Sequence, residues 1–101
     1  MNNKDKILDI AMNLNRIGNW AADGYDAKKK RIILFLDQTQ EYMNSLEDSE
    51  ISDVFKKTLN QFIKEYKKLD KEGRSKPKDE LLWAEKMMTW GNILTHRAKL
   101  L

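Results

Sequence analysis

Apolar residues recur every three or four positions along this chain, which is the spacing of one face of an α-helix. The pattern covers four stretches: residues 3–22, residues 27–45, a third from about Ser52 to Lys71, and a fourth from Pro77 almost to the end. A period-two alternation of β-branched residues, which would indicate strands, is absent. The sequence therefore predicts an all-α protein, with residues 1–101 forming a single helical domain.

Residues that start or stop helices separate these stretches. Residues 47–53 form one connector, in which Ser49 or Ser52 can cap the third helix, and residues 72–77 form another, with Pro77 at the first position of the fourth. Because short connectors make neighbouring helices antiparallel, four helices predict an up-down four-helix bundle.

The first boundary allows a second prediction. Asp23 and Gly24 can end a helix, and Asp26 can cap the next one. However, the apolar spacing continues in phase across this point. The alternative is a three-helix arrangement in which the first two stretches merge into one long helix, kinked at Gly24.

Small residues lie seven positions apart in the first and last stretches, and residues seven apart share a helix face. A strip of small side chains lets another helix approach closely. We therefore expect the first and last helices to pack through Ala11, Gly18, Ala84, Gly91 and Ala98.

The last stretch is apolar on more than one side. Its main stripe includes Trp83 and Trp90, and Leu82, Ile93 and Leu100 form a second stripe. A helix on the outside of a bundle buries only one stripe, and exposed apolar patches usually mark interfaces. The sequence thus predicts a non-enzymatic protein-interaction module that forms a homodimer. The expected interface residues are Leu82, Trp83, Met87, Trp90, Ile93 and Leu94.

A small-molecule site between Trp83 and Trp90 is an alternative function. Two indole rings with Met87 between them would suit a flat ligand. An open cavity lined by these three side chains would favour this hypothesis, and a filled core would remove it.

The basic residues suggest a further alternative. Lysine and arginine number 19 against 16 acidic residues, a formal charge of +3. In an up-down bundle the connectors near Gly24 and Gly73 lie at the same end, which would form an anion-binding site for a nucleic acid or an acidic partner. This alternative is weaker because the basic excess is mild and arginine is scarce. The candidate residues are Lys28, Lys29, Lys30, Arg31, Lys68, Lys71 and Arg74.

Neither a catalytic centre nor a metal site nor a cofactor is expected. The chain has no cysteine and one histidine, which disfavours tight transition-metal binding. Glu85, Thr89, Asn92 and His96 share a polar stripe, but Glu85 and His96 lie about 16 Å apart along the axis. We expect this stripe to be a solvated face.

The chain has no run of roughly 20 consecutive apolar residues, which a membrane span needs, and it has no signal-peptide pattern. The predicted location is therefore the cytoplasm.

Overall fold

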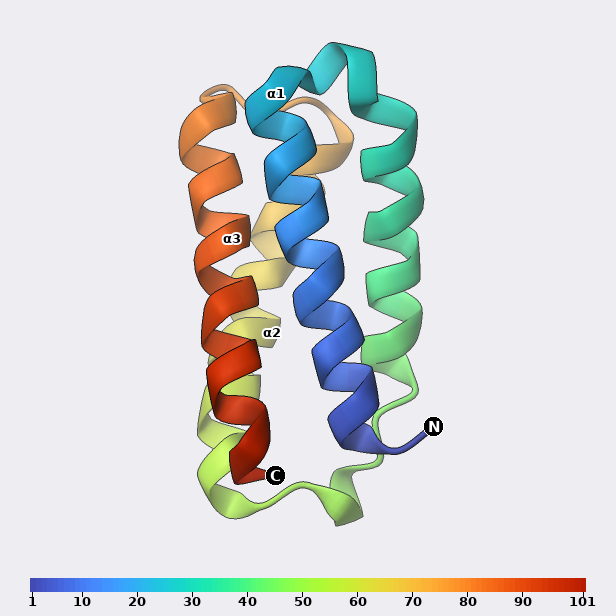
Figure 1. The fold of residues 1–101 in the computed structure, drawn as a ribbon, viewed down its shortest axis with the longest axis vertical. Helices are drawn as coiled ribbons and strands as arrows, with labels where there is room; N and C mark the ends of the chain where they lie inside the picture. Colours follow the sequence, from blue (N-terminus) through green and yellow to red (C-terminus); the bar gives the residue numbers. More distant parts are fainter.

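The computed structural model describes residues 1–101 and contains three α-helices and no strand (Figure 1). The helices are α1 (Asn3–Asn44), α2 (Asp53–Arg74) and α3 (Glu80–Arg97). Two short 3-10 helices, η1 (Asp48–Glu50) and η2 (Ala98–Leu100), follow α1 and α3. The prediction of an all-helical chain is confirmed.

Helix α1 folds back on itself at Gly24, whose φ of 156° and ψ of 95° are not helical. A straight helix of 42 residues would be about 63 Å long, yet the longest dimension of the molecule is 39 Å. Figure 1 shows the two arms of α1, residues 3–23 in blue and residues 25–44 in green, running in opposite directions side by side.

The three helices fit the alternative prediction, in which the first two stretches form one helix kinked at Gly24. The predicted bundle of four separate helices is not confirmed. The reason is local: Gly24 alone leaves the helical conformation inside α1, so no connector of several residues separates the arms. Asp26, predicted to cap a second helix, lies inside α1. Its carboxylate instead pairs with Lys76 Nζ at 2.9 Å.

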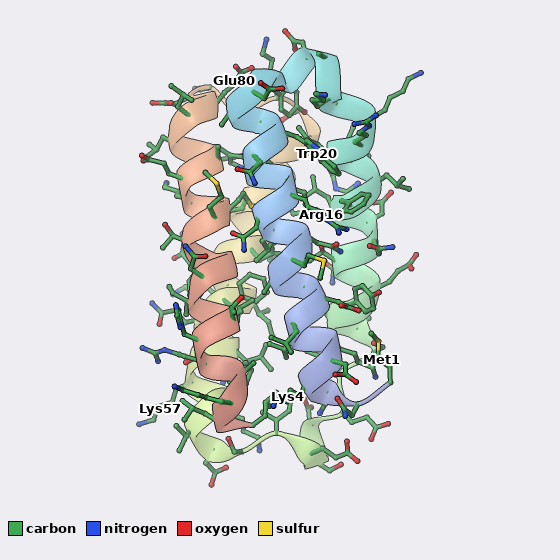
Figure 2. All side chains as sticks on the ribbon, viewed as in Figure 1. Met1, Lys4, Arg16, Trp20, Lys57 and Glu80 are labelled. Carbon is green, nitrogen blue, oxygen red and sulfur yellow. The ribbon has the colours of Figure 1, made fainter.

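Contacts along their length join the two arms. Near the open end, Asn3 holds the connector that follows the second arm: its Nδ2 donates to the Glu47 carbonyl at 2.8 Å, and its Oδ1 accepts from the Glu47 amide at 3.1 Å. Closer to the bend, the Trp20 and Phe35 rings meet edge to face, with their centroids 4.9 Å apart. The Arg16 guanidinium lies 6.0 Å from the Phe35 ring centroid, and Figure 2 shows Trp20 and Arg16 between the arms.

Capping side chains set where the remaining helices begin. Ser52 Oγ accepts from the Phe55 amide at 3.2 Å, which confirms Ser52 rather than Ser49 as the cap of α2. The start of α3 was predicted wrongly. Asp79 Oδ1 accepts from the Leu82 amide at 3.0 Å, so α3 begins at Glu80 and Pro77 lies in the preceding connector. A carboxylate cap satisfies an unpaired amide at the helix start, which Pro77 cannot do.

A continuous core of twenty buried residues draws on both arms of α1, on α2 and on α3. The apolar face of α2 supplies three aromatic rings, those of Phe55, Phe62 and Tyr66. In Figure 1, α3 lies to the left of the first arm and α2 lies behind. Both α2 and α3 therefore keep one side facing outward.

Candidate functional site

The first arm of α1 and α3 approach each other through small residues. A Cβ atom added to Gly18 would lie 2.9 Å from the Ala84 carbonyl oxygen, and one added to Gly91 would lie 3.0 Å from the Ala11 carbonyl oxygen. Ala98 is also buried, at the start of η2. The structure thus brings Ala11, Gly18, Ala84 and Gly91 into one seam, which fixes the side of α3 that faces inward.

Three of the residues predicted to form an interface lie in the core of their own chain. Trp83 is 2% exposed, and Met87 and Leu94 are fully buried. The Trp83 indole nitrogen donates to the Leu69 carbonyl at 3.0 Å. Their assignment to a partner-facing surface was therefore wrong, because the main apolar stripe of α3 is used in packing against α1 and α2.

The other three predicted interface residues lie nearer the surface. Leu82 is 47% exposed, whereas Trp90 and Ile93 are half-buried. The Trp90 ring rests against Phe62, with 5.4 Å between the centroids. Leu82 and Trp90 line a hollow between α2 and α3 with a volume of about 260 Å³, which we call the α2–α3 hollow. Its lining consists of Glu65, Leu69, Leu82, Glu85, Lys86, Thr89 and Trp90.

The space between Trp83 and Trp90 is filled. Neither Trp83 nor Met87 lines any of the three hollows found in the structure, and both are buried. The two tryptophans also have different neighbours, because Trp83 meets Tyr25 edge-on at 6.5 Å and Trp90 meets Phe62. The hypothesis of a ligand site between them is therefore contradicted.

The polar stripe of α3 faces solvent. Its members Glu85, Thr89, Asn92 and His96 are all exposed. The chain contains no group of three or more histidine, aspartate or glutamate side chains placed to hold a metal ion. Glu85 and Thr89 also border the α2–α3 hollow, so part of the stripe forms the rim of that hollow.

Arg74, one of the predicted anion-binding residues, is held by carboxylates. Its Nε donates to Asp70 at 3.1 Å, and its Nη2 lies 2.7 Å from Asp37 Oδ1. The hydrogen bonds to Asp70 and Asp37 raise the pKa of the Arg74 guanidinium above its ordinary value. Arg74 therefore serves as an ionic bridge between α2 and the second arm of α1, not as an open anion site.

The remaining predicted basic residues do not form one site. Lys28 is half-buried, and the Arg31 guanidinium lies 5.9 Å from the Trp20 ring centroid. Lys76 pairs with Asp26 at 2.9 Å and with Glu80 at 3.7 Å. The hydrogen bond to Asp26 raises the pKa of the Lys76 ammonium. Carboxylates thus partly neutralise this end of the bundle.

Lys68 and Lys71 belong to a different surface, the outward face of α2. Lys57, Lys64 and Lys67 share that face and are exposed. Grouping charges by bundle end places Lys64 and Lys67 with Lys68 and Lys71 but leaves out Lys57. The signal for the face is the helical spacing of all five lysines, opposite the buried residues of α2.

Two buried phenols donate to backbone carbonyls. The Tyr25 hydroxyl donates to the Gly73 carbonyl, and the Tyr66 hydroxyl donates to the Leu36 carbonyl at 3.2 Å. Burial disfavours the charged phenolate and raises the pKa of both side chains above its ordinary value. These two hydrogen bonds link α1 to α2, so both hydroxyl groups have a structural role.

Comparison of the chain with protein-family models, with curated proteins and with solved structures finds no match. None of the helices combines the length and apolar character needed to cross a membrane.

Proposed function

We propose that this protein is a small non-enzymatic interaction module that self-associates through the outward side of α3. The observation that carries the proposal is the α2–α3 hollow, an apolar floor of Leu69, Leu82 and Trp90 at the surface with a charged rim. Aromatic side chains with an apolar surround are typical anchors of protein interfaces. We place the centre of the interface at this hollow and no longer at Trp83, Met87 and Leu94, because those three side chains are buried in the core of their own chain.

A second copy of the chain is the partner that we propose. Leu82 and Ile93 are eleven residues apart and lie on nearly the same side of α3. If two α3 helices meet antiparallel about a twofold axis, Leu82 of each copy faces Ile93 of the other. A twofold interface requires such self-complementary pairs. Leu100, which is 42% exposed, extends the apolar surface along the same side.

The non-enzymatic part of the proposal is supported by how the polar groups are used. The buried phenols of Tyr25 and Tyr66 both donate to backbone carbonyls. Glu85 and His96 lie about 16 Å apart along α3, too far to act on one substrate atom. A cytoplasmic location also remains part of the proposal, supported by a composition without cysteine.

Light scattering across a concentration series tests self-association. We expect the wild-type chain to approach twice the monomer mass of 12.0 kDa as its concentration rises. Leu82→Glu should remain monomeric, because it places a carboxylate beside Glu65 and Glu85 in the hollow. The matched control is Leu34→Glu, since Leu34 is 62% exposed and lies on the second arm of α1, away from α3. A wild-type chain that stays monomeric, or two variants that behave alike, would overturn the proposal.

A further inference from the structure

The outward face of α2 carries a ridge of five exposed lysines: Lys57, Lys64, Lys67, Lys68 and Lys71. At 100° per residue these side chains fall within a sector of about 100°, opposite the buried face of the helix. We call this surface the α2 lysine ridge. Figure 2 shows Lys57, near one end of the ridge, projecting outward from the bundle.

Few acids lie beside the ridge: Asp53, four residues before Lys57, pairs with Lys56 at 3.8 Å, and Glu72 follows Lys71. None of the five lysines takes part in an ion pair. Between residues 57 and 71 the helix has two carboxylates, and both lie to the side of the ridge. Glu65 lines the α2–α3 hollow, and Asp70 is bound by Arg74.

The ridge gathers five of the 19 basic residues of the chain on one face of one helix. A face with this charge can meet a polyanion directly. Such an arrangement steers association at low salt.

We propose that the α2 lysine ridge binds the phosphate backbone of a nucleic acid duplex. The five charges extend over fourteen residues, which is about 21 Å, or about one charge every 4–5 Å. Each strand of a duplex presents about one phosphate every 3.4 Å along its axis. The ridge therefore carries a line of positive charge whose density is of the same order as that of the phosphates of a duplex.

The ridge is long and narrow, and carboxylates border it. Glu65 lies on the side toward α3, and Asp70, which Arg74 binds, lies on the side toward α1. We choose a duplex as the partner because a phosphate backbone is a similarly long and narrow line of charge. Because lysine is a point charge without the planar fork of arginine, we expect binding without sequence preference.

Fluorescence anisotropy with a labelled duplex DNA of about 20 base pairs tests the proposal at salt concentrations from about 50 to 200 mM. We expect the logarithm of the association constant to fall with the logarithm of salt concentration with a slope of about −4 to −5, because five phosphate contacts release about 0.9 counterion each. The double variant Lys64→Gln/Lys68→Gln should reduce that slope by about two and weaken binding by about tenfold or more at the lower salt concentration.

The matched control is Lys29→Gln/Lys30→Gln, which removes the same charge from the second arm of α1. It should bind nearly as tightly as the wild-type chain, and circular dichroism should show that both variants keep their helices. Absence of binding at the lowest salt, or an equal loss in both variants, would overturn the proposal. Tighter binding of the wild-type chain to phosphatidylserine vesicles or to a polyglutamate peptide than to the duplex would also overturn the proposal.

Discussion

Trp83 and Leu69 join α3 to α2 through a hydrogen bond of 3.0 Å between the indole nitrogen and the backbone carbonyl. The same indole ring meets Tyr25 edge-on, and Tyr25 in turn donates to the Gly73 carbonyl one turn beyond Leu69. A Cβ atom at Gly73 would collide with the Trp83 ring. The last turn of α2 is thus fitted to this tryptophan, which makes Trp83 a structural residue of the monomer.

We predict that Trp83→Ala destabilises the chain far more than Trp90→Ala does. Removing the fully buried indole leaves a cavity and an unpaired carbonyl, for a loss of about 3–5 kcal/mol in the free energy of unfolding. Trp90 is half-buried against Phe62, so its removal leaves a smaller cavity and should cost less than half of that amount. Urea unfolding followed by circular dichroism measures both values. Equal losses would show that the two rings are equally buried in solution.

Gly91→Leu should destabilise the chain by about 1–3 kcal/mol through overpacking. A Cβ atom at Gly91 would lie 2.6 Å from Asn15 Oδ1 and 3.0 Å from the Ala11 carbonyl oxygen, so the larger side chain must push α3 away from the first arm. The adjacent Asn92→Leu is the control, because Asn92 is exposed and should change stability little. If thermal unfolding shows equal stability for Gly91→Leu and the wild-type chain, the two helices do not approach as closely as the structure indicates.

The seam of small residues could be predicted from the sequence, but the division of α3 into buried and exposed apolar residues could not. Close approach of two helices depends mainly on small side chains recurring on one face, and that spacing is visible at Gly18, Ala84 and Gly91. Periodicity also shows that Trp83 and Trp90 share a side of α3. It does not reveal which neighbouring helix covers each ring, because that depends on how the helices are rotated against one another.

The bend at Gly24 is a second feature that the apolar spacing of the sequence could not predict. The apolar spacing continues in phase across Gly24, but the stop and cap residues Asp23, Gly24 and Asp26 led the sequence prediction to favour two helices over one. The backbone angles of Gly24 decided between them by turning the chain within one residue. Similarly, Pro77 had the residue type expected at a helix start, but the side chain of Asp79 formed the actual cap.

Gly24→Ala should lower the free energy of unfolding by about 1–3 kcal/mol, since residues with a side chain rarely adopt a φ of +156°. No atom lies within 4 Å of a Cβ added at Gly24, so the cost would arise from the backbone alone and not from a clash. Asp23→Ala, at the neighbouring exposed position, serves as the control and should stay within about 0.5 kcal/mol of the wild-type chain. Thermal unfolding that does not distinguish the two variants would contradict a bend of this geometry.

The stability of the chain should fall as the pH rises above about 10, the ordinary pKa of tyrosine. Burial raises the pKa of Tyr66 in the folded chain, so the folded state keeps the phenol proton while the unfolded state loses it. Below pH 10 both states are protonated and the full stability is present. Above pH 10 the unfolded state binds fewer protons, and each such tyrosine lowers the free energy of unfolding by about 1.4 kcal/mol per pH unit.

Tyr66→Phe isolates this contribution. At pH 8 the variant should be less stable by about 1 kcal/mol, because the Leu36 carbonyl loses the hydroxyl that donates to it. Between pH 10 and 11 its stability should fall less steeply than that of the wild-type chain, since one titrating group is gone. Lysines titrate in the same range in both proteins, so the difference between the two urea-unfolding curves removes their contribution. Parallel pH profiles would show that Tyr66 ionises equally well in the folded and unfolded states, which a buried phenol cannot do.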